Sequence, residues 1–329
     1  MRKLRVWLTT IVALLYSLTA SAYDFEVDGI RYDITSFTDL TVKASSISEA
    51  LTGELVIPSK VQFNGKELVV TDICNDFAIS NDAISSLTVN EGVKSIGERA
   101  FKDCKNLTNI NIAQTITQIG VECFYGCTSL STFDNRGIVS LGAKTFAECR
   151  NLKEISIENL TSLAEGCFLN CTKLSACNLP NITSIGKEAF KNCQSLIEYN
   201  ITNGVISIED SAFEGCFAIS SIIIPNNVTD LGFNVFKGCT SLTSISIGSG
   251  LCYLPWVFEG CSNLSDIRIE DATTTLKFGY TGQRNYKSDY NGQYIKNTVS
   301  HAYVSSAMFV GKNLREVYIG RNKIGRAHV

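Results

Sequence analysis

The sequence contains little histidine, little proline and no long hydrophobic run, and each shortage excludes a class of protein. Only two histidines occur in 329 residues, which argues against most histidine-based catalysis and multi-histidine metal sites. Four prolines exclude collagen-like and proline-rich architectures. Lys and Arg number 29 against 32 Asp and Glu, a formal net charge of −3. The chain therefore has no basic excess for a phosphate backbone, and we expect no nucleic-acid partner.

Motifs of enzyme chemistry are also missing from the chain. There is no Gly-x-Ser-x-Gly elbow, no phosphate-binding loop and no dinucleotide fingerprint. Carboxylates are scattered, and a pair suited to glycoside hydrolysis stays an open alternative, although nothing singles one out. We therefore expect a non-enzymatic protein with no catalytic residue, no metal and no cofactor. The content of 45% hydrophobic and 19% charged residues is that of a folded chain.

Residues 1–22 have the pattern of a cleavable secretory signal peptide. Arg2, Lys3 and Arg5 precede an apolar run of 13 residues, and Ala20-Ser21-Ala22 offers small residues for cleavage before Tyr23. The alternative is a membrane anchor, but a spanning helix needs about 20 apolar residues. We expect a secreted or cell-surface protein with no membrane span.

The last six residues, 324–329, resemble a sequencing adapter translated in one frame. We expect this hexapeptide to be an artefact and the gene to continue beyond Lys323; the alternative is a natural tail.

The body of the chain is one repeat of 22–23 residues. Its unit is approximately Ile-Gly-x3-Phe-x2-Cys-x2-Leu-x2-Ile-x-Ile, and two columns recur through eight copies. The phenylalanine column comprises Phe101, Phe124, Phe146, Phe168, Phe190, Phe213, Phe236 and Phe258. The cysteine column lies three residues later and comprises Cys104, Cys127, Cys149, Cys171, Cys193, Cys216, Cys239 and Cys261.

Such a unit predicts a repeat solenoid, because one copy cannot bury its own apolar face and stacked neighbours bury it together. Segments such as Leu242–Ile247 alternate with period two and predict short parallel strands about 4.8 Å apart. We expect the Phe-x2-Cys half to return the chain through a short helical turn.

These residues resemble the BspA-like bacterial leucine-rich repeats. The resemblance implies a right-handed coil, a β-rich N-terminal cap at 23–70, repeats at 71–270 and surface adhesion as the function. Phe258 and the next matching phenylalanine, Phe309, lie 51 residues apart, which predicts an insertion at 271–308 and the start of a further repeat at 309–323.

The 13 cysteines fit packing better than disulfides or zinc. Ten occupy repeat columns, Cys177 replaces a strand isoleucine, and no Cys-x2-Cys pair is present. Regular stacking also rarely gives the dihedral angle that a disulfide requires. We expect free, buried thiols.

Two surfaces are candidates for binding. The first is the exposed strand face, whose candidate residues are Asn111, Asp134, Asn178, Asn200 and Arg268, with further positions Asn109, Thr132, Glu154, Ser156, Glu198, Ser221, Ile223, Ser244, Ser246 and Asp266. The second is the insertion, which holds Tyr280, Tyr286, Tyr290, Tyr294 and Tyr303. Ordinary solvated surface and a decorative insertion are the alternatives.

The sequence therefore indicates an extracellular binding or adhesion protein whose partner is a protein or glycan. The alternative is an accessory or glycan-binding module of a secreted hydrolase whose C-terminal part is missing.

Overall fold

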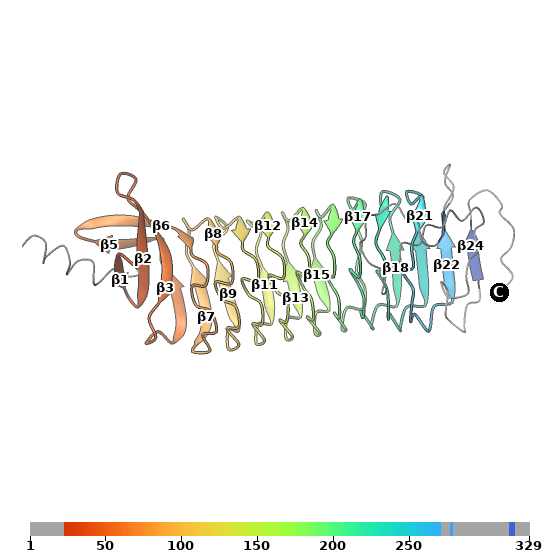
Figure 1. Cartoon of the computed structure of the whole chain (residues 1–329), viewed down its shortest axis with the longest axis horizontal. Coiled ribbons are helices and arrows are strands. Elements are labelled where there is room, and N and C mark those ends of the chain that lie inside the picture. The colour runs from red at the N-terminus through yellow and green to blue at the C-terminus, as the bar shows by residue number, and fades with distance from the viewer. Residues whose placement is uncertain (1–22, 271–276, 279–315, 320–329) are drawn as a thin grey trace, which may run out of the picture.

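The computed structural model describes residues 23–270, 277–278 and 316–319, with side chains for 23–270. These residues form an elongated stack of coils with strands on two sides and a cap at the N-terminal end (Figure 1). The predicted solenoid with parallel short strands is confirmed. Among the described residues, no helix has the length and apolar character needed to cross a bilayer.

One side of the coil carries what we call the front ladder, whose strands pair in parallel within three successive sheets. Ser221 pairs with Ser244 and Ser244 with Asp266, so one coil spans 22 or 23 residues. Its strands are β4 (Gly53–Ile57), β7 (Ile84–Val89), β9 (Asn109–Ile112), β11 (Thr132–Asp134), β13 (Glu154–Ser156), β15 (Ala176–Asn178), β18 (Ser221–Ile224), β20 (Ser244–Ile247), β22 (Asp266–Ile269) and β24 (Glu316–Ile319). In most of these strands from β4 to β22 alternate residues are buried, as in the exposed–buried pattern of β18.

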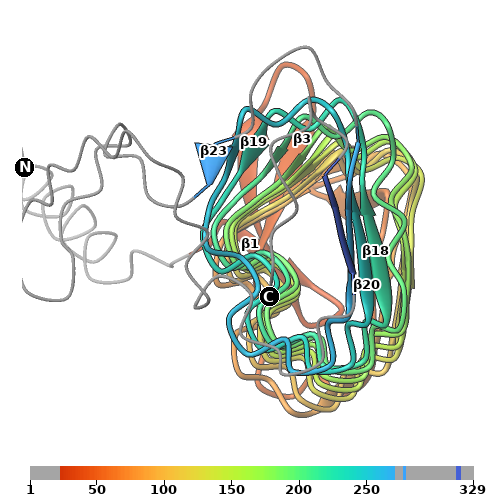
Figure 2. The same ribbon diagram turned by 90° about the vertical axis from the view of Figure 1, so that its right-hand side faces the viewer.

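The back ladder lies on the other side of the coil, where Figure 2 shows β19 opposite β18 and β20. Its strands are β6 (Lys66–Ile73), β8 (Ser95–Ile96), β10 (Gln118–Ile119), β12 (Ser140–Leu141), β14 (Ser162–Leu163), β16 (Ser184–Ile185), β17 (Ser207–Ile208), β19 (Asp230–Leu231), β21 (Tyr253–Leu254) and β23 (Lys277–Phe278). Each coil thus places one strand in each ladder, except that the coil of residues 198–201 has none in the front ladder, and the core lies between the ladders.

The N-terminal end is built from antiparallel strands that join the first coil. Strands β1 (Phe25–Val27), β2 (Ile30–Ser36) and β3 (Thr41–Ile47) form a meander, and β5 (Lys60–Phe63) pairs with β6. Strand β3 then pairs with β6 in parallel and continues the back ladder. Phe25 stacks on Phe63 with ring centroids 4.2 Å apart, and its side chain belongs to the same hydrophobic core as the coils.

A column of phenylalanine rings runs through the core. From Phe101 to Phe258 successive rings stack with centroids 5.2–6.2 Å apart and interplanar angles of 9–23°. Phe77, in the degenerate first repeat, meets Phe101 edge-on at 5.8 Å. All of these rings are at most 2% exposed, so each coil buries its largest side chain only because a neighbouring coil covers it.

The predicted helical turn around Phe-x2-Cys is wrong, because the described residues contain no helix. The residues two before and two after most of the phenylalanines have positive φ, for example Arg99 at 51° and Asp103 at 58° on either side of Phe101. Left-handed residues four positions apart allow runs of at most three right-handed residues between them, which is too short for a helix. The Phe101 N–H therefore donates to the Cys123 carbonyl of the next coil, at 2.9 Å, instead of closing a helical turn.

The cysteine column lies beside the rings, and its thiols donate hydrogen bonds between coils. Cys171 Sγ, for example, lies 3.0 Å from the Phe146 carbonyl oxygen of the preceding coil. The same contact recurs at 3.0–3.3 Å from Cys127 to Cys261, and Cys104 makes the equivalent bond to Ala78 at 3.1 Å. All 13 cysteines are free, and the eight in the column are buried.

The last coil contains extra chain between its two strands. Asp266 of β22 pairs with Glu316 of β24, 50 positions further on, whereas the paired front-ladder neighbours from β7 to β22 are 22 or 23 positions apart. Strand β23 pairs with β21 and lies inside the segment 271–308 that the sequence assigns to an insertion. The surplus residues are therefore those between β23 and β24, while the domain boundaries themselves stay predictions.

Candidate binding groove

The outward residues of the front ladder form two rows that run across the coils. Residues in the first and third strand positions, such as Glu154 and Ser156 of β13, face outward, while Ile155 between them is buried. The candidates Asn111, Asp134, Asn178, Asn200 and Arg268 are all exposed and all lie in the row of third positions. The repeat thus brings side chains from distant parts of the chain onto one face.

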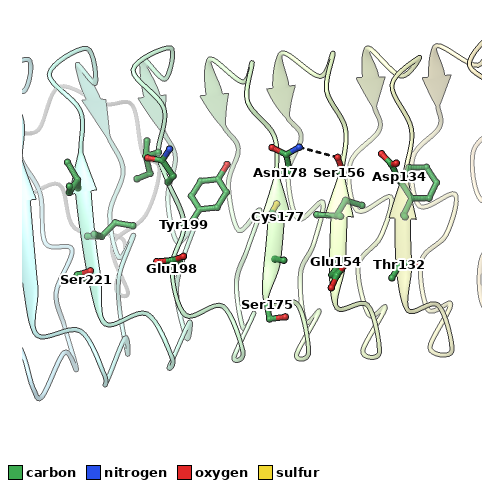
Figure 3. A pocket seen from close by; sticks show the side chains of 17 residues that line it. Thr132, Asp134, Glu154, Ser156, Ser175, Cys177, Asn178, Glu198, Tyr199 and Ser221 are labelled. Atoms are coloured by element: carbon green, nitrogen blue, oxygen red, sulfur yellow. Dashed lines mark hydrogen bonds between the residues drawn. The ribbon is translucent and has the colours of Figure 1, made fainter.

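A hollow of about 730 Å³ lies in the middle of this face, and we call it the front groove (Figure 3). It crosses five coils, from Thr132 on β11 to Ile223 on β18. Of the candidates, Asp134, Asn178 and Asn200 line the groove. Asn111 lies outside its lining, one coil before Asp134.

Small side chains and an interrupted ladder explain why the groove lies here. Ala176 occupies the row of first positions between Glu154 and Glu198, and Cys177 stands where β13 has Ile155. The front ladder also stops after β15 and resumes at β18, because residues 198–201 form no strand. The groove is therefore deeper at Ala176 than at the neighbouring first positions, Glu154 and Glu198. The coil of residues 198–201 forms no strand pairing with β15 or β18.

The groove is acidic. Asp134, Glu154 and Glu198 line it, and no lysine, arginine or histidine does. Within the described chain, none of these three carboxylates forms an ion pair or a hydrogen bond through its side chain. Their charges are therefore available to a partner.

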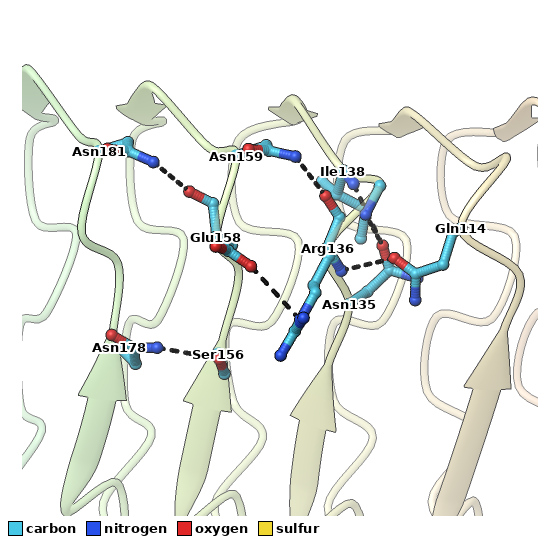
Figure 4. Close-up of polar contacts among 10 residues, drawn as sticks. Gln114, Asn135, Arg136, Ile138, Ser156, Glu158, Asn159, Asn178 and Asn181 are labelled. Atoms are coloured by element: carbon cyan, nitrogen blue, oxygen red, sulfur yellow. Dashed lines mark hydrogen bonds and ion pairs between the residues drawn. The ribbon is translucent and has the colours of Figure 1, made fainter.

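The rim above the groove is held by contacts between coils (Figure 4). Asn159 Nδ2 donates to the Arg136 carbonyl at 2.7 Å, and Asn181 Nδ2 donates to the Glu158 carbonyl at 2.8 Å. The Arg136 guanidinium pairs with Glu158 at 3.3 Å, so this cation at the rim already has an anionic partner. On the face itself, Asn178 Nδ2 donates to Ser156 Oγ at 3.2 Å.

The aromatic rings at the groove face the core and not the solvent. The Tyr199 ring packs between Phe190, at 4.9 Å, and Phe213, at 5.4 Å, and the residue is 7% exposed. Burial raises the pKa of its phenol well above the usual value. Its hydroxyl forms no hydrogen bond with the described residues. Phe133, the other aromatic residue in the lining, is 3% exposed, so the groove presents no ring face on which a sugar could stack.

A second hollow, of about 620 Å³, continues the first toward the C-terminal coils and shares Ser221, Ile222 and Ile223 with it. Ile223 is 67% exposed and is an apolar member of the mostly polar row of third positions. Asp266 and Arg268 lie at the far end, where Arg268 pairs with Glu270 at 3.1 Å.

The predicted tyrosine cluster, Tyr280, Tyr286, Tyr290, Tyr294 and Tyr303, lies outside the described residues. The Phe and Cys columns lie in the core, away from the groove. Ala176 and Tyr199 are lining residues that sequence reasoning missed. Ala176 replaces a polar residue in the row of first positions, and Tyr199 aligns with Ile155 and Ile222 in the buried row between the two exposed ones. Such departures from the repeat could have identified both residues.

Among the described residues, no group of three His, Cys, Asp or Glu side chains is arranged to hold a metal ion. The groove offers carboxylates, amides and hydroxyls spaced by the coil repeat, which is an arrangement suited to binding an extended partner.

Comparison with known proteins places the chain in a family. The family model described as BspA type leucine rich repeat region, in six copies, matches residues 72–197 and 161–280. A crystal structure of a leucine-rich repeat protein from Bacteroides ovatus is 28% identical, covers 78% of each chain and has a TM-score of 0.55. A leucine rich cell surface protein from Faecalibacterium prausnitzii is 19% identical over 77% of this chain and 96% of its own, with a TM-score of 0.48. No curated protein matches. Since the family model covers more than half of the sequence, the chain belongs to the BspA-type leucine-rich-repeat family.

Proposed function

We propose that this chain is an extracellular, non-enzymatic binding protein of the adhesion type, and that it holds a host or cell-surface macromolecule in the front groove. The observation that carries the proposal is the groove itself. It spans five coils and is lined by exposed polar side chains, and its three carboxylates have no partner among the described residues. Surfaces of this kind on a rigid solenoid are used for recognition.

The extracellular part of the proposal is supported by residues 1–22, whose composition is that of a secretory signal. The non-enzymatic part is supported by the chemistry of the groove residues. Residues 23–270 contain no histidine, and the lining cysteine, Cys177, has a pKa raised by burial, which opposes thiolate formation.

The alternative, an accessory or glycan-binding module of a secreted hydrolase, depends on the tyrosine cluster and on chain beyond Lys323. The front groove gives it little support, because sugar binding commonly uses an exposed aromatic face. A polypeptide partner fits the amide, hydroxyl and carboxylate lining better.

The proposal is tested with the full chain, screened against extracellular-matrix proteins, mucin-type glycoproteins and oligosaccharides. Asn200→Trp fills the groove, and Gln118→Trp places the same ring on the exposed back ladder as a matched control. We expect Asn200→Trp to weaken binding by about tenfold or more and Gln118→Trp to leave it unchanged.

Equal binding by both variants would show that the groove is not the recognition surface. Turnover of peptide or glycan substrates by the purified chain, lost in a groove variant, would overturn the non-enzymatic proposal.

A further inference from the structure

Two carboxylates lie on either side of Ala176 in the front groove. Glu154 and Glu198 lie on the two sides of the strand that carries Ala176, Cys177 and Asn178 (Figure 3). Glu154 lies on the paired strand next to Ala176, about 4.8 Å away along the ladder, and Glu198 lies one coil beyond Ala176 on the unpaired segment, with a methyl side chain between the two glutamates. An ammonium or guanidinium group entering over Ala176 would lie between the two carboxylates.

A third polar group is available at the same place. Tyr199 is buried to more than nine-tenths, lines the groove, and leaves its hydroxyl without a hydrogen-bond partner among the described residues. In Figure 3 its ring leans toward the coil of Cys177 and Asn178. The hydroxyl oxygen of Tyr199 can accept a hydrogen bond from an N–H group of a ligand that enters the groove.

The dimensions of the groove suit an extended peptide segment. At about 4.8 Å per paired coil, five coils extend for at least about 19 Å, which is the length of about six residues of extended chain. Asn178 and Asn200, in the row beside the two glutamates, offer amide groups that can pair with a peptide backbone. Arg136 at the rim pairs with Glu158, and this pairing reduces its repulsion of a positive charge bound in the groove.

We propose that the front groove binds a basic segment of a polypeptide, with one lysine or arginine side chain seated over Ala176 between Glu154 and Glu198. The inference rests on the proposed function and names the chemistry of its ligand. Shape and charge act together at this position, because the small side chain of Ala176 leaves space between the two glutamates in the row of first positions.

The probes are fluorescein-labelled peptides of eight lysines or eight arginines, with eight glutamates and a glycine–serine peptide of equal length as references. Binding to the full chain is measured by fluorescence anisotropy at increasing salt concentration. We expect the basic peptides to bind, the reference peptides not to bind, and affinity to fall as salt screens the carboxylates.

Three kinds of variant distinguish binding of one basic side chain over Ala176 from a general electrostatic attraction to the acidic protein. Glu154→Gln and Glu198→Gln each remove one carboxylate, and Ala176→Leu fills the seat without changing any charge. Each should weaken binding about tenfold. Glu165→Gln removes an equal charge from an exposed position outside the groove and should stay within about twofold.

Tyr199→Phe removes the hydroxyl and keeps the packed ring, so it should weaken binding by about threefold with an unchanged unfolding midpoint. All variants are checked for native far-ultraviolet circular dichroism before their affinities are compared.

The inference falls if the basic peptides do not bind, if Ala176→Leu binds them normally, or if Glu165→Gln weakens binding as much as Glu154→Gln. If it falls while Asn200→Trp still abolishes binding to a ligand from the wider screen, the groove remains the recognition surface and only its ligand was misassigned. If neither test responds to groove variants, the proposed function falls as well.

Discussion

At the scale of single residues, the buried columns set both stability and its dependence on pH. Each phenylalanine packs against two neighbours, and each column cysteine donates from sulfur to a carbonyl in the preceding coil. Burial raises the pKa of the column thiols, to about 12 for Cys104 and Cys261 and further for the inner ones. These thiols therefore stay protonated wherever the coil is folded.

The ring column predicts a large cost for a single truncation. Phe190→Ala should lower the free energy of unfolding by about 3–5 kcal/mol, because Phe168, Tyr199 and Phe213 all lose a contact. Urea unfolding measures this change. The control is Phe37→Ala, whose ring is 73% exposed and whose loss should change the free energy by under about 0.5 kcal/mol. Comparable losses for both would contradict the role of the stack.

The thiols predict alkaline instability. An unfolded thiol has a pKa near 8.5, so above about pH 8.5 the unfolded chain releases protons that the folded chain retains. Stability is therefore fully present below that pH and is lost as pH rises above it.

Double substitution of Cys123→Ala and Cys167→Ala should make this fall shallower. Both residues are fully buried with raised pKa values, and other repeats place alanine in their column. Urea midpoints at pH 7, 9 and 10 measure the slope. A slope that is equal in wild type and variant would contradict this origin of the pH dependence.

At the scale of elements, the sequence predicts the ladders but not the turn that joins them. Apolar residues at Phe, Cys and Leu recur three positions apart, a spacing that one face of a helix also has, but the predicted helical turn is absent from the described residues. The backbone is decided instead by the residues between those columns, such as Gly126, Asn170 and Gly238, which all have positive φ. Glycine and asparagine tolerate that conformation at low cost, and their recurrence before the cysteine was the unused signal.

A pair of glycine substitutions tests this turn. Gly238→Ala should lower the free energy of unfolding by about 1–2 kcal/mol, because φ is +73° although the space for a Cβ is open. Gly204→Ala, at a glycine outside the left-handed region and with its nearest neighbour 3.4 Å from the added Cβ, should be close to neutral. Thermal denaturation of both variants distinguishes backbone conformation from simple loss of glycine.

At the scale of the whole molecule, the repeat columns predict where a residue lies but not what departs from the repeat. Asp134, Asn178 and Asn200 lie on the exposed strand face, as the period-two register predicts, and their role in binding stays a proposal. The groove depends on irregularities, namely Ala176, Cys177 and the missing strand at 198–201, and averaging over copies hides these. Their joint effect appears only when the coils are stacked.

The interruption predicts uneven local stability along the solenoid. Backbone amides of 198–201 should exchange with deuterium faster than those of β13 and β20, which are paired on both sides. Hydrogen–deuterium exchange with mass spectrometry resolves these segments. Slower exchange at 198–201 than in the flanking strands would show that the coil is held in some other way.

The same interruption has a mechanical consequence. A solenoid pulled along its axis carries the load from coil to coil, so it behaves as a series of links of unequal strength. The coil at 198–201 is bonded to its neighbours through the back ladder, where β17 pairs with β16 and β19, but not through the front one. Under tension the front groove would open more easily than coils that are paired in both ladders, and a ligand bound across it would join the coils on its two sides.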